Sequence, residues 1–203
     1  MSLLRQLFEK PWHAGRAADL RGDHALPLPA PTLGLRVVLT VVTVLFSLMV
    51  VAYGDRMSAS DWRPFPEPTI LWLNTIILVV SSLAWHWACI NARRSEIEGV
   101  KTGLLVGGGS AVAFLIGQYW AWRQMIALGY YADTNPANAF FYLVTAVHGL
   151  HLLGGLVAWG RTTNRVWRGD DLAAVRLSVE MCAIYWHFLL AVWLVLFGLL
   201  LFT

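Results

Sequence analysis

The chain has 203 residues, of which 58% are hydrophobic and only 13% are charged. Soluble domains carry about 45–50% apolar and about 25% charged residues, so this composition excludes a single water-soluble domain. It also excludes a disordered chain, which would be poor in apolar residues and rich in charge. The net charge of +3 therefore bears on membrane sidedness, and we expect no nucleic-acid partner.

Residues 1–34 are predicted to form a cytoplasmic N-terminal leader. Pairs of apolar side chains lie among charged ones over residues 3–10, which suits either a short interfacial helix or a frayed terminus. Prolines at positions 27, 29 and 31 then predict a stiff, extended approach to the first span. No cleavable signal peptide is expected, because a long charged segment precedes the first apolar run.

Five apolar stretches are long enough to cross a bilayer, which takes about 20 residues for about 30 Å of hydrocarbon. They cover about residues 35–53, 69–90, 102–122, 138–159 and 177–202. Helices are expected, because exposed backbone groups find no water in lipid. A membrane β-barrel would instead show alternating segments of about 10 residues. The sequence therefore predicts an all-α integral membrane protein, with residues 35–203 as one five-helix domain.

The basic residues are unevenly distributed between the predicted connections. Twelve of the 15 Lys and Arg residues lie in residues 1–36 and in the connections after the second and fourth spans. The positive-inside bias places these segments, and the N-terminus, in the cytoplasm. The C-terminus is then external, on the side where aromatic side chains suited to a membrane interface gather.

Small and polar residues recur at helical spacing within four of the spans. Such stripes predict seams between helices, because small residues allow close approach and polar ones bond across the contact. No catalytic, cofactor-binding or metal-binding residue is predicted. The candidates for structural, subunit or lipid contacts are Asn74, Ser81, Gln118, His148, His151, Glu180, Trp186 and His187.

The histidines allow two interpretations. His148 and His151 are three residues apart on one helix face, and His187 is near the middle of the last span. Facing imidazoles can hold a haem iron, so a b-type haem-binding membrane cytochrome is an alternative. Hydrogen bonding to neighbouring helices is the simpler interpretation. His86 lies near the cytoplasmic end of its predicted span, beside two tryptophans, and is expected at the interface.

Glu180 is the one carboxylate that lies clearly inside a predicted span. A proton relay across a membrane normally needs a chain of titratable groups, which this residue and His187 do not make. We expect Glu180 to pair with a His or Arg of a neighbouring helix. The chain also carries no phosphate-binding glycine loop, nucleophile elbow or metalloprotease helix.

Motifs in the last two spans carry a resemblance that extends from about residue 35 to the end of the chain. They are Phe140-Phe141-Tyr142-Leu143, Thr145, His148-Gly149-Leu150-His151 and Gly154-Gly155, then Glu180, Tyr185-Trp186-His187-Phe188 and Trp193. Asn74-Thr75, Ser81-Ser82 and Gln118 ahead of Trp122 add to them. With these motifs the chain resembles subunit III of the haem-copper oxidases, the family of cytochrome c oxidase and the bacterial quinol oxidases.

The resemblance implies a short, five-helix bacterial form, with two helices set against three and lipid in the cleft. It implies a non-catalytic subunit of a respiratory terminal oxidase in the bacterial inner membrane. The haems and copper would lie in oxidase subunit I, with subunit II as a further partner and phospholipid bound to this chain. The implied role is to support the stability, lipid binding and sustained proton uptake of subunit I. Cytochrome c and quinol both remain open as electron donors.

Three positions depart from the family pattern. The family usually carries acids where this chain has Val42, Ala121 and Leu190. Their loss weakens a role for the chain's own carboxylates in feeding protons, and leaves the structural and lipid-binding roles intact. It also makes an accessory protein of a nitric oxide reductase an alternative function.

Overall fold

The computed structural model describes residues 30–63 and 68–202, which form five α-helices and no strand. The helices are α3 (Ala30–Met57), α4 (Ile70–Arg93), α5 (Ile97–Ala127), α6 (Pro136–Arg168) and α7 (Leu172–Leu201). All five are long and apolar enough to cross a membrane. The all-α fold with five spans is thus confirmed, while the orientation of the termini stays a prediction. The proposed interfacial helix of the leader lies outside the described residues.

The helices extend beyond the predicted spans. α6 has 33 residues, which at about 1.5 Å per residue is longer than about 30 Å of hydrocarbon. It continues through Arg161, Arg165 and Arg168, because backbone hydrogen bonds form regardless of whether side chains face lipid or water. α3 begins ahead of its predicted start and holds Pro31 in its first turn, where no backbone N–H is needed.

Local signals explain the short connection between α6 and α7. α6 ends at Gly169, whose φ of 73° is a left-handed conformation that glycine adopts without strain. α7 begins after Asp171, whose side chain accepts a hydrogen bond from the amide of Ala174 at 3.3 Å. The connection therefore takes only residues 169–171, and the one between α4 and α5 takes residues 94–96.

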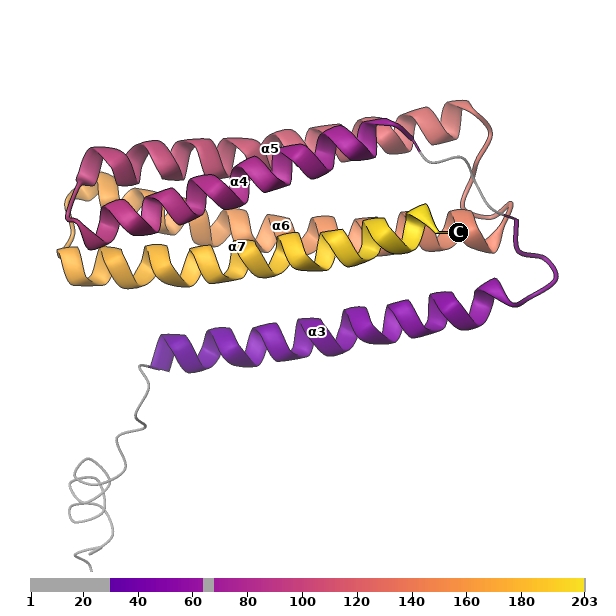
Figure 1. Ribbon diagram of the computed structural model, residues 1–203, viewed down its shortest axis with the longest axis horizontal. Helices are drawn as coiled ribbons and strands as arrows, with labels where there is room; N and C mark the ends of the chain where they lie inside the picture. The colour runs from indigo at the N-terminus through magenta and orange to yellow at the C-terminus, as the bar shows by residue number, and fades with distance from the viewer. Residues whose placement is uncertain (1–29, 64–67, 203) are drawn as a thin grey trace, which may run out of the picture. The chain divides into compact units, whose positions relative to one another are not determined.

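The chain divides into two units, residues 1–38 and 39–203. The described part of the first unit is the start of α3. In the second unit, α4 packs against α5 and α7, and α6 packs against the same two helices. Consecutive members of α4–α7 run in opposite directions (Figure 1), so the two short connections lie at one end of this four-helix group.

From Leu39 onwards, α3 joins the four-helix group through side chains. Val42 and Phe46 pack with Val144 of α6 and Leu196 of α7. Among the described residues, the close backbone approaches between helices all lie within α4–α7. In the described residues α4–α7 thus pack as one group, to which α3 is joined by side chains.

Close contact between α4 and α5 depends on glycines. A Cβ on Gly103 would meet the side chain of Ala88, and a Cβ on Gly107 would meet the indole of Trp85. Helices in lipid gain little from burying apolar surface against each other, so tight packing and hydrogen bonds must hold them together. These glycines allow that packing along α5.

Candidate functional site

The seam between α4 and α5 brings three of the predicted residues into buried contacts. The Asn74 amide donates to Oε1 of Gln118 at 3.3 Å. About two turns further along α4, the Ser81 hydroxyl donates to the carbonyl of Gly107 at 2.8 Å. A Cβ on Gly117 would collide with Oδ1 of Asn74, so glycine at this position makes room for the amide pair.

Indole groups join α5 to α6. Nε1 of Trp159 donates to the carbonyl of Leu104 at 2.8 Å, and the same ring covers Gly108. Nε1 of Trp122 donates to the Thr145 hydroxyl at 3.0 Å. Sequence reasoning missed Trp159, because a tryptophan near the end of a span is usually interpreted as an interfacial anchor. Gly108 could have indicated this contact, because a glycine inside a span predicts that a large side chain of another helix lies against it.

The contact between α4 and α7 contains paired tryptophans. The buried rings of Trp85 and Trp186 stack with centroids 5.9 Å apart and an interplanar angle of 15°. Nε1 of Trp193 donates to the hydroxyl of Thr75 at 2.9 Å. The predicted candidate Trp186 thus lies in the interior, in the seam between these two helices.

Glu180 pairs with arginines near the end of the four-helix group that holds the short connections. Its Oε1 accepts from Nε of Arg93 in α4 at 3.0 Å and from Nε of Arg176 in α7 at 3.3 Å. The expected pairing with a basic residue of a neighbouring helix is therefore present. The carboxylate lies in a partly exposed ion pair that links α4 to α7.

His148 is fully buried between helices. Its ring lies against Phe46, Phe114 and Trp193, with centroid separations of 6.3, 5.8 and 5.3 Å. Among the described residues, neither ring nitrogen has a hydrogen-bond partner. The structure does not show the predicted hydrogen bond from this imidazole to a neighbouring helix. Aromatic rings surround it instead.

His151 lies one turn from His148 on the same helix, with a different environment. Its Nδ1 is hydrogen-bonded to the Val147 carbonyl at 2.7 Å, and its ring lies 5.4 Å from that of Phe46. Its backbone carbonyl accepts from the Tyr185 hydroxyl at 2.9 Å. The contact from α7 to this turn of α6 is thus made to the backbone of His151.

His187 is placed on the side of α7 that faces α4. Its Nδ1 and the Ser82 hydroxyl are hydrogen-bonded at 2.5 Å, and its ring centroid lies 6.2 Å from that of His86. His86 of α4 therefore lies beside the middle of α7. Its expected place at the membrane interface stays a prediction. His148 contacts Phe46, Phe114 and Trp193, whereas His187 contacts Ser82 and His86. A haem held by His148 or His151 together with His187 stays an untested alternative.

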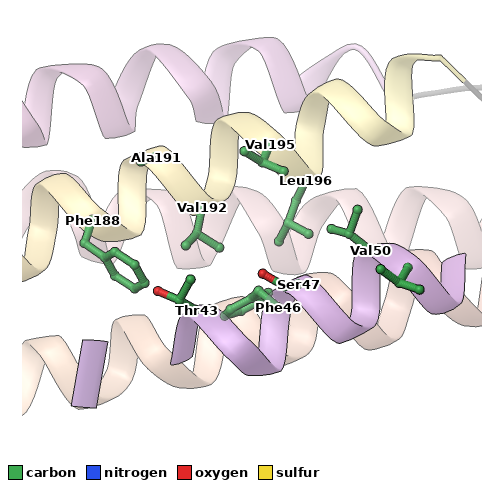
Figure 2. Close-up of a pocket in the computed structure, with 10 residues that line it drawn as sticks. Thr43, Phe46, Ser47, Val50, Phe188, Ala191, Val192, Val195 and Leu196 are labelled. Atoms are coloured by element: carbon green, nitrogen blue, oxygen red, sulfur yellow. The ribbon is translucent and has the colours of Figure 1, made fainter. Parts of the chain in front are cut away.

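A groove of about 410 Å³ lies between α3 and α7 (Figure 2). Its lining is almost entirely apolar and includes Phe46, Phe188, Val192 and Leu196. Figure 2 shows the Thr43 and Ser47 side chains of α3 on the same side of the groove. The Thr43 hydroxyl bonds back to the carbonyl of Leu39 at 2.7 Å, so it adds little polarity to the groove.

The three positions at which the family usually carries acids lie in the packed interior or against it. Val42 is buried with Val144 and Leu196, and Ala121 is fully buried. Leu190 packs against the main core.

Comparison with known proteins gives one consistent result. A family model described as cytochrome c oxidase subunit III matches residues 58–202. Among similar proteins, the cytochrome c oxidase subunit 3 of Thermostichus vulcanus is 30% identical over 88% of this chain and 90% of that protein. The probable cytochrome c oxidase subunit 3 of Mycobacterium bovis is 27% identical over 71% of this chain and 73% of its own length. The probable cytochrome c oxidase subunit 3 of Nocardia farcinica is 28% identical over 78% of this chain and 79% of its own length.

The matched region contains α4 to α7 with their seams and the histidine and glutamate motifs of the last two helices. The five membrane-spanning helices fit the same assignment. This multi-pass membrane chain belongs to the cytochrome c oxidase subunit III family.

Proposed function

We propose that the chain is the non-catalytic third subunit of a haem-copper terminal oxidase in a bacterial inner membrane. It would stabilise oxidase subunit I, bind phospholipid and sustain proton uptake by the assembled enzyme. The observation that carries the proposal is that polar side chains in the spans form hydrogen bonds between helices. Asn74, Ser81 and Trp159 hold one helix to the next, as expected of a scaffold.

The haems and copper are assigned to partner subunits. Within residues 30–63 and 68–202, no three His, Cys, Asp or Glu side chains come close enough to hold a metal ion. His148 and His187 have separate surroundings, which supports the same assignment. His148 is surrounded by aromatic rings and His187 is bonded to a hydroxyl, as expected of residues that pack helices together.

Lipid binding is assigned to the groove between α3 and α7. The groove lies along membrane-spanning segments and is lined by residues such as Phe46, Val192 and Leu196. An acyl chain suits this lining, because only Thr43 and Ser47 among the ten lining residues have polar side chains. Replacing Ala191, which also lines the groove, with Trp should reduce the lipid retained by the purified complex in native mass spectrometry. Unchanged lipid retention would contradict this assignment.

Support of proton uptake is proposed to be indirect. Val42, Ala121 and Leu190 supply no titratable group, and Glu180 is held by two arginines. The chain would therefore act by keeping subunit I and its lipid in place during turnover. Oxidase depleted of this chain should start at the normal rate and then lose activity faster than the complete complex.

Purification from native membranes in a mild detergent tests the central proposal. The tagged chain should bring down a subunit that contains haem and copper, and the complex should reduce oxygen. Isolation of the chain alone, or with unrelated partners, would contradict the proposal. A catalytic partner that reduces nitric oxide and not oxygen would instead support an accessory role in a nitric oxide reductase.

A further inference from the structure

The outer side of the α4–α7 contact carries two imidazoles whose hydrogen-bonding capacity is not fully used within the described residues. We call this surface the histidine face and define it by Ser82, Leu83, His86, Ile184 and His187. His86 is exposed, and among the described residues it makes no hydrogen bond. The bond from Ser82 occupies only Nδ1 of His187, so the other ring nitrogen is left for a partner.

His86 and His187 both lie within helices that are long and apolar enough to span a membrane. His187 is seven residues along α7 from Glu180, and His86 is seven residues along α4 from Arg93. At about 1.5 Å per residue, both imidazoles lie about 10 Å further into the membrane than the Arg93–Glu180 pair. At that depth, neither lipid headgroups nor water can supply a hydrogen bond to an imidazole.

Exposed polar side chains inside a bilayer normally face protein, because lipid tails offer them no hydrogen bond. The apolar neighbours Leu83 and Ile184 are 64% and 51% exposed, so the surface around the imidazoles is open. Elsewhere in the described chain, the long exposed stretches of α3 carry apolar side chains such as Val41 and Leu48, which suit lipid. The histidine face differs from them in needing hydrogen-bonding partners.

We propose that the histidine face is the docking surface for a transmembrane helix of the catalytic subunit, which presents a hydrogen-bonding side chain to His86. This inference rests on the proposed function and adds to it the surface through which the partner is held. The partner helix packs over Leu83 and Ile184 and covers the free nitrogens of His86 and His187.

Site-specific photocrosslinking in native membranes tests the docking surface. p-Benzoylphenylalanine is introduced at Leu83, at Ile184 and, as a matched control, at Leu150 of α6, which is 66% exposed. Positions 83 and 184 should both give adducts with the haem-containing subunit, and position 150 should give none. Adducts with lipid only, or with a second copy of this chain, at positions 83 and 184 would overturn the inference.

Substitution of His86 gives a second readout. Loss of one interhelical hydrogen bond in a membrane corresponds to a reduction of about three- to twentyfold in association constant. His86→Leu should reduce recovery of the catalytic subunit to that extent, and His86→Gln should restore much of it. Because His86 is exposed, the thermal unfolding of the isolated chain should be unchanged in both variants. Equal recovery with His86→Leu and with the parent would contradict the proposal.

The two proposals fail in different ways. If the tagged parent chain recovers no haem-containing subunit, the proposed function is wrong. If it recovers that subunit and neither position 83 nor position 184 crosslinks to it, only the docking surface is wrong.

Discussion

The indole Nε1 of Trp193 donates a hydrogen bond to Oγ1 of Thr75, which joins α7 to α4 in the interior of the protein. The Thr75 hydroxyl in turn donates to the carbonyl of Leu71 at 2.8 Å. This second bond fixes the direction of the hydroxyl and leaves its lone pairs for the indole. Trp193 is fully buried, so the indole has no access to water.

Thr75→Val should destabilise the protein, because it preserves the shape of the side chain and removes the acceptor for Trp193. Interhelical hydrogen bonds in membranes contribute about 0.6 kcal/mol on average and up to about 1.7 kcal/mol. The free energy of unfolding in mixed micelles should fall by that amount. Thr43→Val is the matched control, since the Thr43 hydroxyl bonds only within α3. Equal losses in both variants would contradict a special role for the Thr75–Trp193 bond.

Two adjacent glycines on α5 should respond in opposite ways to alanine. A Cβ on Gly108 would collide with the indole of Trp159, whereas a Cβ on Gly109 would meet nothing within 4 Å. Gly108→Ala should cost about 1–3 kcal/mol through overpacking. Gly109→Ala should stabilise by up to about 1 kcal/mol, because alanine favours helix. Thermal unfolding of the two variants in detergent measures this difference, and similar midpoints would show that Trp159 can move aside.

His148→Leu should leave the protein as stable as the parent or slightly more stable. The substitution keeps a buried apolar side chain and removes two ring nitrogens without hydrogen-bond partners among the described residues. Ser82→Ala provides the contrast, because it leaves His187 without its hydroxyl partner and should cost about 0.6 kcal/mol. A loss greater than about 2 kcal/mol for His148→Leu would indicate that the imidazole has a partner, such as a buried water.

Glu180→Gln should weaken the contact between α4 and α7 in a salt-dependent way. The carboxylate pairs with Arg93 and Arg176 at a partly exposed site, where an ion pair contributes about 0.2–1 kcal/mol. The difference between variant and parent should shrink above about 0.5 M salt, since screening then acts within a few ångströms. Glu98→Gln is the control, because Glu98 pairs with Lys101 on its own helix. A salt-independent loss for Glu180→Gln would contradict the ion-pair explanation.

Hydropathy predicted the five spans because a bilayer requires long apolar helices, whatever their neighbours. It did not predict their ends. The predicted fourth span stopped at Trp159, before the first of the arginines near the end of α6, yet the helix continues to Arg168. A charged side chain marks where hydrocarbon ends, whereas a glycine such as Gly169 marks where the helix ends.

The stripes of small and polar residues identified helix contacts but not their partners. Asn74 and Gln118 were each recognisable as polar residues inside a span, and their pairing depends on the register between α4 and α5. The histidines show the same limit. His148 is enclosed by aromatic rings and His187 lies at a partly open surface, although both sit near the middle of a span.

The amide pair of Asn74 and Gln118 has a consequence for biogenesis. Each side chain alone would bring an unsatisfied amide into the bilayer when its helix leaves the translocon. Together, the two amides bond to each other, and only residues 94–96 separate the helices that carry them. Insertion of α4 and α5 as a helical hairpin would let this amide pair form as the two helices enter the lipid.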